Sequence, residues 1–217
     1  MKKRVSLYIV LTIILFSSTV FGVMLNENKE ASLNMEVLQG QKVIDNTSII
    51  EESTRQLKID YIKGLTKLNN VQSEFLLKQC DEKELDVFLV LGLMKVESNF
   101  NTKLVGSLGE RGLGQLMDGT ARTLARNLNK KYDPSYLFKP EYNIELFTTH
   151  LKYLKGYYNG NVHKILTAYN RGQYGLKKYM ASRSSTRNPE SSIYSNRVIE
   201  YKIKFKRAFE NFIDSQK

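Results

Sequence analysis

The chain has 217 residues, of which 41 % are hydrophobic and 11 % aromatic, so a disordered or collagen-like chain is excluded. Its 33 Lys and Arg residues against 22 Asp and Glu residues give a net charge of +11, which favours an anionic partner. The single cysteine, Cys80, excludes an internal disulfide and a zinc site built on several cysteines.

The first 25 residues have the pattern of an export signal. Lys2, Lys3 and Arg4 precede residues 5–25, which contain no charged side chain. A basic segment before an apolar run is typical of a signal peptide, and this run is also long enough to span a bilayer. The pattern leaves open whether the segment is cleaved or retained as a membrane anchor. In both cases we expect an extracytoplasmic protein of a bacterium, which argues against a nucleic acid as the partner.

Residues 26–60 are predicted to form a polar stalk or linker, because they contain no aromatic residue and are rich in Asn, Ser, Gln and Glu. All aromatic residues beyond the export segment lie at Tyr61 or later, so the folded domain is expected to cover residues 61–217. The positive charge belongs to this part of the chain, since residues 81–217 carry a net charge of +9 and residues 26–80 a net charge of −1.

The folded part is predicted to be mainly α. Residues 85–96 are apolar at most positions, which indicates a helix buried nearly all round. A short helix is predicted for residues 162–170, and a long last helix is capped by Ser191 or Ser192. Helical spacing of apolar residues also occurs in residues 59–68, 118–128 and 144–158.

Glu97 directly follows the apolar run. A buried carboxylate there lowers the stability of the fold unless it is paired with another group, or it is kept because it has a function. Burial and the C-terminal end of a helix both raise a carboxyl pKa, and a carboxylic acid that is protonated near neutral pH can act as a general acid. The alternative is a solvated Glu at a helix end. In the glycine-bearing segment that follows, Gln115 offers an amide donor and acceptor that suit sugar hydroxyl and N-acetyl groups.

Four short motifs follow one another in the chain. They are Glu97-Ser98 with Asn99-Phe100-Asn101 behind it, the Gly-x-x-Gly-Leu-x-Gln-Leu-Met stretch of residues 109–117, Asn143-Ile144, and Ala168-Tyr169-Asn170-x-Gly172. In this order they resemble the soluble lytic transglycosylase (SLT) domain of bacterial lytic transglycosylases, a lysozyme-like family. The resemblance covers about residues 83–205 and implies a lysozyme-like helical domain.

The resemblance implies a peptidoglycan lytic transglycosylase with Glu97 as its single general acid/base. Such an enzyme cleaves the β-1,4 bond between N-acetylmuramic acid and N-acetylglucosamine without water and leaves 1,6-anhydro ends. Tyr169 and Tyr194 are also implied to orient Glu97 by hydrogen bonds. The implied substrate-binding residues are Ser98, Gln115, Met117, Tyr169, Asn170 and Tyr194. No metal and no cofactor are implied, and the partners are glycan strands of peptidoglycan and an envelope-spanning assembly.

Two acidic residues depart from the family pattern, Glu110 in place of a small residue and Asp118 in place of a proline. Either can supply a second carboxylate, and a second carboxylate that activates water turns the reaction into hydrolysis. A hydrolytic muramidase is therefore one alternative. The other is a non-catalytic peptidoglycan-binding or scaffold module of a secretion or conjugation apparatus.

Some residues outside these motifs are given a structural interpretation. His150 and His163 have no ligand partner at a metal-binding spacing and are predicted to lie at the surface. Tyr153, Tyr157 and Tyr158 suit a platform for sugars, but packing between helices is the favoured interpretation.

Overall fold

The computed structural model describes residues 49–216, so the predicted export segment and most of the predicted stalk lie outside the described residues. The described residues divide into two units between Arg55 and Gln56. Of the first unit only residues 49–55 are described, and they are helical. Within the described range, no helix is long and apolar enough to cross a membrane.

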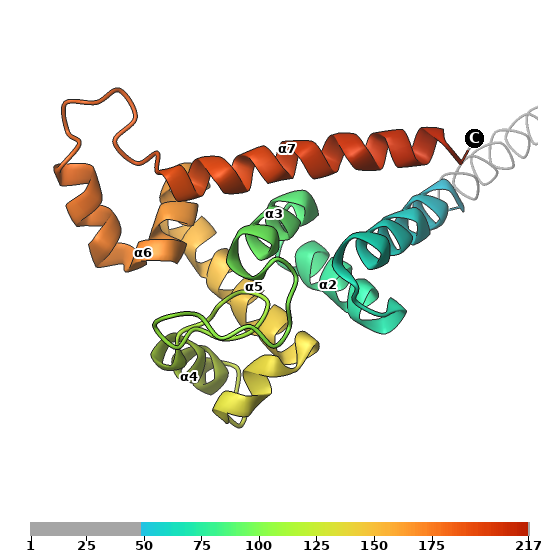
Figure 1. Ribbon diagram of the computed structural model, residues 1–217, viewed down its shortest axis with the longest axis horizontal. Coiled ribbons are helices and arrows are strands. Elements are labelled where there is room, and N and C mark those ends of the chain that lie inside the picture. Colours follow the sequence, from blue (N-terminus) through green and yellow to red (C-terminus); the bar gives the residue numbers. More distant parts are fainter. Residues whose placement is uncertain (1–48, 217) are drawn as a thin grey trace, which may run out of the picture. The chain divides into compact units, whose positions relative to one another are not determined.

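The second unit folds almost entirely into helices, which confirms the predicted mainly α class for the described residues (Figure 1). Its only extended pairing in this range consists of two isolated bridges, Val105 with Arg111 and Arg111 with Leu116. After the helical residues 56–66, the elements are α2 (Asn70–Glu82), α3 (Val87–Ser98), α4 (Asp118–Asn127), the 3₁₀ helix η1 (Pro134–Phe138), α5 (Pro140–Tyr157), α6 (Val162–Ala181) and α7 (Ile193–Asp214).

Helix α3 is the buried helix that the apolar run predicts. The Asp86 side chain caps its first turn by accepting hydrogen bonds from two backbone N–H groups. The helix packs mainly against α7, which passes above it at an angle in Figure 1. Its fully buried side chains are Val90, Leu91, Leu93 and Met94. Because each such side chain stabilises the fold by about 1.5–3 kcal/mol, the position of Glu97 in the last turn of α3 is firmly fixed.

Helix α5 is the other central element of this unit. It contacts α2, α4, α6 and η1. Its buried face follows the expected spacing from Ile144 to Leu154, and Tyr158 is half-buried. The buried side chains of that face are Ile144, Phe147, Leu151 and Leu154, and Leu146 is buried on another side of the helix. One core centred on α5 therefore holds α2, α4, α6 and η1 together.

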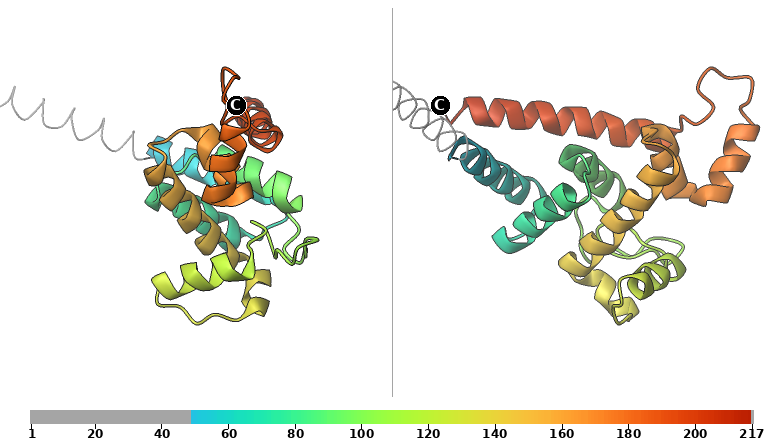
Figure 2. Two further views of the ribbon diagram at one scale, coloured as in Figure 1. Left: turned by 90° about the vertical axis from the view of Figure 1, so that its left-hand side faces the viewer. Right: turned by 180° about the vertical axis from the view of Figure 1, so that it is seen from behind.

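Helix α6 corrects one prediction. The helix expected to end at residue 170 continues to Ala181 through a kink at Gly172, where φ is 71° and ψ is 163°. Figures 1 and 2 show the change of direction between the two parts of α6. Glycine adopts this positive φ without steric cost, so the chain bends there and helical hydrogen bonding resumes beyond it. The kink directly follows Tyr169 and Asn170, two of the predicted site residues.

Candidate active site

A pocket of about 450 Å³ brings together five of the predicted site residues. Its wall is formed by the end of α3, the loop at residues 104–117, and the helices α4, α5 and α6. Glu97, Gln115, Met117, Tyr169 and Asn170 all line this pocket, although they come from three separate segments of the chain. The remaining two, Ser98 and Tyr194, do not line it.

Glu97 is a half-buried carboxyl group whose pKa lies far above its usual range. Burial disfavours the charged form and raises the pKa of Glu97 to about 7. The hydrogen bond from Tyr194 acts in the opposite direction, and the charge of Glu110 raises the pKa further. A carboxyl group with a pKa near 7 is available both as an acid and as a base at neutral pH.

Tyr169 and Tyr194 have different roles, which corrects one expectation. Tyr194 donates a hydrogen bond from its Oη to Oε1 of Glu97 at 2.5 Å, as the resemblance implies. Tyr169 does not contact Glu97 in this way, because its Oη donates to the carbonyl oxygen of Gly114 at 2.7 Å. Tyr194 therefore orients the carboxyl group, whereas Tyr169 fixes the loop that faces it.

Ser98 was expected to line a sugar subsite, but it is 3 % exposed and serves the fold instead. Its Oγ donates to the carbonyl oxygen of Leu113 at 2.9 Å and so ties the end of α3 to the loop. Gln115 is also partly committed to the loop, since its Nε2 donates to the carbonyl oxygens of Leu104 and Gly112. Only the carbonyl oxygen of the Gln115 side chain is left as an acceptor for a ligand.

Asn143 on α5 is the anchor of this loop, a role that the motif alone did not indicate. Its side chain is 1 % exposed and makes three hydrogen bonds. Its Oδ1 accepts from the backbone N–H of Gly114 at 2.8 Å. Its Nδ2 donates to the carbonyl oxygens of Arg111 at 3.0 Å and Leu137 at 2.9 Å. One buried amide therefore connects the loop, η1 and α5.

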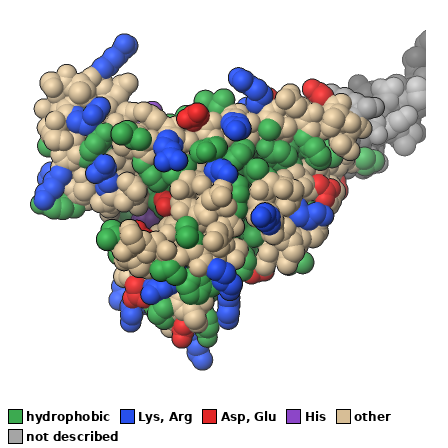
Figure 3. All heavy atoms as spheres, viewed as in Figure 1, with side chains coloured by type: hydrophobic (Ala, Val, Ile, Leu, Met, Phe, Trp, Pro, Cys, Tyr) green, Lys and Arg blue, Asp and Glu red, His purple; other side chains and the backbone are tan. Residues whose placement is uncertain are grey.

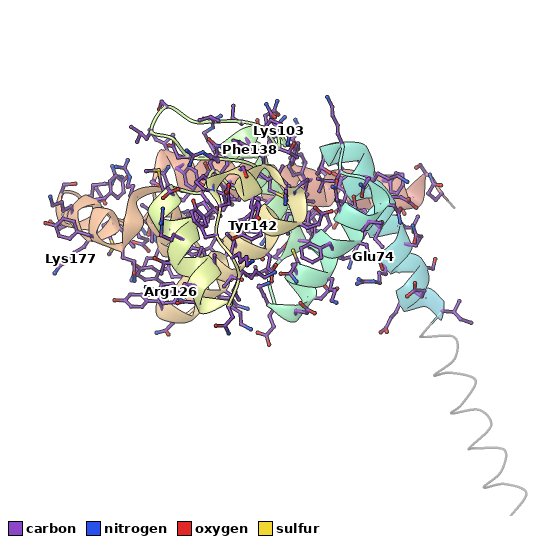
Figure 4. All side chains as sticks on the ribbon, turned by 90° about the horizontal axis from the view of Figure 1, so that it is seen from below. Glu74, Lys103, Arg126, Phe138, Tyr142 and Lys177 are labelled. Atoms are coloured by element: carbon purple, nitrogen blue, oxygen red, sulfur yellow. The ribbon has the colours of Figure 1, made fainter. Side chains whose placement is uncertain are left out.

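The loop approaches η1 so closely that one position requires glycine. At Gly112, where φ is 75°, a Cβ atom would lie 2.2 Å from the carbonyl oxygen of Leu137. Just before this loop, the Lys103 ammonium lies 5.7 Å from the centre of the Phe138 ring, and Figure 4 shows these two side chains together. The loop is thus held on both edges, which keeps the pocket wall in place.

The two additional carboxylates lie in different surroundings. Glu110 lines the same pocket as Glu97, and its Oε2 accepts a hydrogen bond from the backbone N–H of Leu108 at 2.9 Å. Asp118 lies outside the pocket lining and is held by Tyr132 at 2.5 Å and by Arg122 at 3.1 Å. Glu110 is therefore the only one of the two that can face a ligand beside Glu97.

His150 is a site residue that the sequence interpretation missed. It was predicted to lie at the surface, but it is half-buried and lines the pocket, with its ring centre 5.4 Å from that of Tyr169. Burial lowers the pKa of His150 to about 4, so the ring is neutral at neutral pH. The spacing of His150 from Phe147 and Leu154 on one helical face was the available signal. Among the described residues, no cluster of His, Cys, Asp or Glu is suited to hold a metal ion.

An NMR titration of the Glu97 side-chain carboxyl carbon is expected to give a midpoint near pH 7, because burial raises this pKa. Tyr194→Phe is expected to raise the midpoint, since it removes a hydrogen bond that favours the charged form. Glu110→Gln is expected to lower it, since a neighbouring negative charge is lost. Asp118 is the internal control, because Tyr132 and Arg122 hold the pKa of that carboxyl below its usual range. A Glu97 midpoint near the ordinary 4.5 would contradict the burial described here.

Comparison with known proteins gives a consistent match. The family model for the transglycosylase SLT domain matches residues 74–192. A putative soluble lytic murein transglycosylase of Haemophilus influenzae is 32 % identical over 126 residues, which cover 58 % of this chain and 21 % of that protein. A membrane-bound lytic murein transglycosylase C of Edwardsiella ictaluri is 34 % identical over 107 residues, which cover 45 % of this chain and 30 % of that protein. The chain thus spans less than a third of the length of either relative.

Solved structures agree with this match at the level of the fold. The 70 kDa soluble lytic transglycosylase of Escherichia coli superposes with a TM-score of 0.56 at 21 % identity, covering 62 % of this chain and 24 % of that chain. A 70 kDa soluble lytic transglycosylase in complex with bulgecin A gives a TM-score of 0.55 at 21 % identity, covering 65 % of this chain and 26 % of that chain. At these identities the likeness shows a shared fold.

Proposed function

The chain belongs to the transglycosylase SLT domain family, as its motifs predict, and from this membership we propose that it is a peptidoglycan lytic transglycosylase. Its relatives are named lytic murein transglycosylases, which supports the glycan strand of peptidoglycan as the substrate. The single observation that carries the proposal is Glu97, a carboxyl group with a pKa of about 7 in a pocket lined by Tyr169, Gln115 and Asn170.

In the first step, protonated Glu97 donates its proton to the glycosidic oxygen between N-acetylmuramic acid and N-acetylglucosamine. The bond from C1 of the muramic acid to that oxygen breaks, and N-acetylglucosamine leaves with a new hydroxyl group. Tyr194 fixes the direction of the carboxyl group through its hydrogen bond to Oε1, and the acetamido group of the substrate stabilises the positive charge at C1.

In the second step, the Glu97 carboxylate takes the proton of the C6 hydroxyl group on the same muramic acid. The C6 oxygen then bonds to C1 and closes the 1,6-anhydro ring. Glu97 regains the proton that it gave up, and no water is consumed. A pKa near 7 suits both steps, because neither form of the group is strongly disfavoured.

Hydrolysis by the same fold is the second candidate, and Glu110 is the observation that favours it. Glu110 lines the Glu97 pocket, whereas Asp118 is held by Tyr132 and Arg122 outside the pocket lining. A carboxylate in that position can activate a water molecule for attack on C1. The transglycosylase remains our conclusion because one backbone N–H group already holds Glu110 in the loop, which gives it a structural role.

The masses of muropeptides released from purified peptidoglycan distinguish the two reactions. We expect the full chain to release products with anhydro ends, each lighter by one water molecule than a product with a reducing end. Glu110→Gln is expected to keep the same anhydro products, because the closing oxygen comes from the substrate. If the parent chain released products with reducing ends and Glu110→Gln did not, the reaction would be hydrolysis. If the parent chain bound peptidoglycan but released no product, it would be a scaffold.

We also propose an extracytoplasmic location, with residues 5–25 as a cleavable signal or a membrane anchor. The relatives include proteins named as soluble and as membrane-bound murein transglycosylases, which supports action at the cell wall. Figure 3 shows Lys and Arg side chains spread over the face that it views. A dispersed positive charge attracts an anionic wall polymer without a dedicated contact. An envelope-spanning assembly remains part of this proposal.

A further inference from the structure

The first turn of α7 carries Tyr194, whose hydroxyl group fixes the carboxyl group of Glu97. The first N–H groups of a helix have no partner within the helix, so a first turn loosens easily unless other groups hold it. The first buried apolar side chain of α7 is Val198, which lies one turn beyond Tyr194. The position of Tyr194 therefore depends on the polar groups that surround the start of α7.

Three buried hydroxyl groups hold this turn, and we call them the hydroxyl cluster. Thr167 on α6 and Ser195 on α7 are 0 % exposed, and Ser192 is 3 % exposed. Ser192 caps α7, because its Oγ accepts a hydrogen bond from the backbone N–H of Ser195 at 3.1 Å. In return, Oγ of Ser195 accepts from the backbone N–H of Ser192 at 2.9 Å. The two serines flank Tyr194 in the chain and so fix the backbone that carries it.

Thr167 connects this cap to α6, whose first part lies beside the start of α7 in Figure 1. The Thr167 hydroxyl group donates to the carbonyl oxygen of Glu190 at 2.9 Å, and its Oγ1 lies 2.9 Å from Oγ of Ser192. Thr167 has one hydroxyl hydrogen, and Glu190 receives it. The Ser192 hydroxyl group is therefore the donor to Thr167, and the cap of α7 is tied to α6 by its own side chain.

His163, one turn earlier on α6, completes the arrangement. It was predicted to lie at the surface, but it is half-buried, and its Nδ1 lies 3.0 Å from Oγ of Ser195. The Ser195 hydroxyl hydrogen goes to the carbonyl oxygen of Ser192 at 3.0 Å, so we assign the ring proton of His163 to Nδ1. Beyond the kink of α6, the Tyr179 hydroxyl group donates to the carbonyl oxygen of Ser191 at 3.0 Å. Both parts of α6 thus hold the chain where it enters α7.

We propose that Thr167 is a positioning residue for the cleavage reaction, which acts through the cap of α7 on Tyr194 and through Tyr194 on the carboxyl group of Glu97. This inference rests on the proposed function, in which Glu97 is the acid and the base. Helix α6 also carries Tyr169 and Asn170 in the pocket wall. One helix therefore places the pocket wall directly and the group that orients the carboxyl through Thr167. Because a hydrogen bond weakens steeply when it is misaligned, a small shift of the first turn of α7 is enough to release Glu97.

Thr167→Val tests this role, because valine keeps the shape of the side chain and leaves Ser192 and Glu190 without their partner. On soluble peptidoglycan fragments, the full chain is expected to show about fivefold lower kcat, the effect of one weakened hydrogen bond, with KM unchanged. The NMR midpoint of Glu97 is expected to rise, as in Tyr194→Phe, since the hydrogen bond from Tyr194 favours the charged form. Thr167→Ser keeps the hydroxyl group and is expected to restore both values.

Thr148→Val is the matched control, because Thr148 is also 0 % exposed and its hydroxyl group donates to carbonyl oxygens of its own helix, α5. It is expected to leave kcat and the Glu97 midpoint at the parent values. Ser195→Ala removes the other half of the cap and is expected to reproduce the effects of Thr167→Val. In a chain that already carries Tyr194→Phe, Thr167→Val is expected to have no further effect on Glu97, because the two residues act in series.

A Glu97 midpoint that stays at the parent value in both Thr167→Val and Ser195→Ala would overturn the inference. A fall in kcat that adds fully to that of Tyr194→Phe would overturn it as well, since it would show that Thr167 acts on the fold and not through Tyr194. The midpoint is measured without cleavage. A chain that releases no product but shows the expected midpoint shifts would therefore support the positioning of Glu97 and contradict the proposed function alone.

Discussion

Glu97→Gln is expected to reduce the rate of peptidoglycan cleavage by about 10³-fold or more. The substitution preserves the size of the side chain but removes the proton that the glycosidic oxygen needs and the base that the C6 hydroxyl group needs. Neither additional carboxyl group is expected to take over as the acid, since a backbone N–H group holds Glu110 in its own loop and Asp118 is held by Tyr132 and Arg122. The rate of muropeptide release under saturating peptidoglycan measures the effect.

Glu74→Gln is the matched control for this variant, because Glu74 is an exposed acid on α2 (Figure 4). Its cleavage rate is expected to equal that of the parent chain. Binding of sugar oligomers to Glu97→Gln should also persist, which separates lost chemistry from lost folding. A Glu97→Gln variant that cleaves within tenfold of the parent rate would require a different acid and would overturn the mechanism.

Asn143→Leu is expected to lower the free energy of unfolding by about 4 kcal/mol, because each buried backbone group left without a partner costs about 1–3 kcal/mol. Three such groups lose their partner here, the N–H of Gly114 and the carbonyl oxygens of Arg111 and Leu137. Urea denaturation followed by circular dichroism measures the change. The cleavage rate should fall as well, because the same loop carries Gln115 into the pocket.

Asn211→Leu makes the same substitution at an exposed position of α7 and serves as the control. Its free energy of unfolding is expected to stay within about 0.5 kcal/mol of the parent value. If Asn143→Leu also changed stability by less than 1 kcal/mol, the buried amide would not be the anchor of the loop.

The helices could be predicted because their cause is local. The apolar run at residues 85–96 identifies α3, and the spacing of apolar residues identifies α5. The prediction for α6 stopped too early, since a glycine that ends one helical segment does not prevent a second one from starting. A sequence pattern reports the break at Gly172 but not whether tertiary contacts continue the helix beyond it.

The position of Glu97 in the pocket could also be predicted, but only from the buried helix end together with the four ordered motifs, because its place at the helix end alone also fits a solvated Glu. The partners of the other motif residues could not. Ser98 was expected to contact the ligand and Tyr169 to orient Glu97, but both hydroxyl groups donate to carbonyl oxygens of the loop at residues 104–117. Whether His150 and Tyr153 line a cavity depends on where α4 and α6 pack against α5. The spacing of residues within one helix does not contain that information.

Digestion of purified peptidoglycan in water enriched in heavy oxygen tests most directly the claim that Glu97 acts as both acid and base without water. The account predicts anhydro muropeptides that carry no heavy oxygen, because the oxygen that closes the ring comes from C6 of the substrate. Muropeptides with reducing ends that carry one heavy oxygen at C1 would contradict it, since their C1 oxygen would come from the solvent.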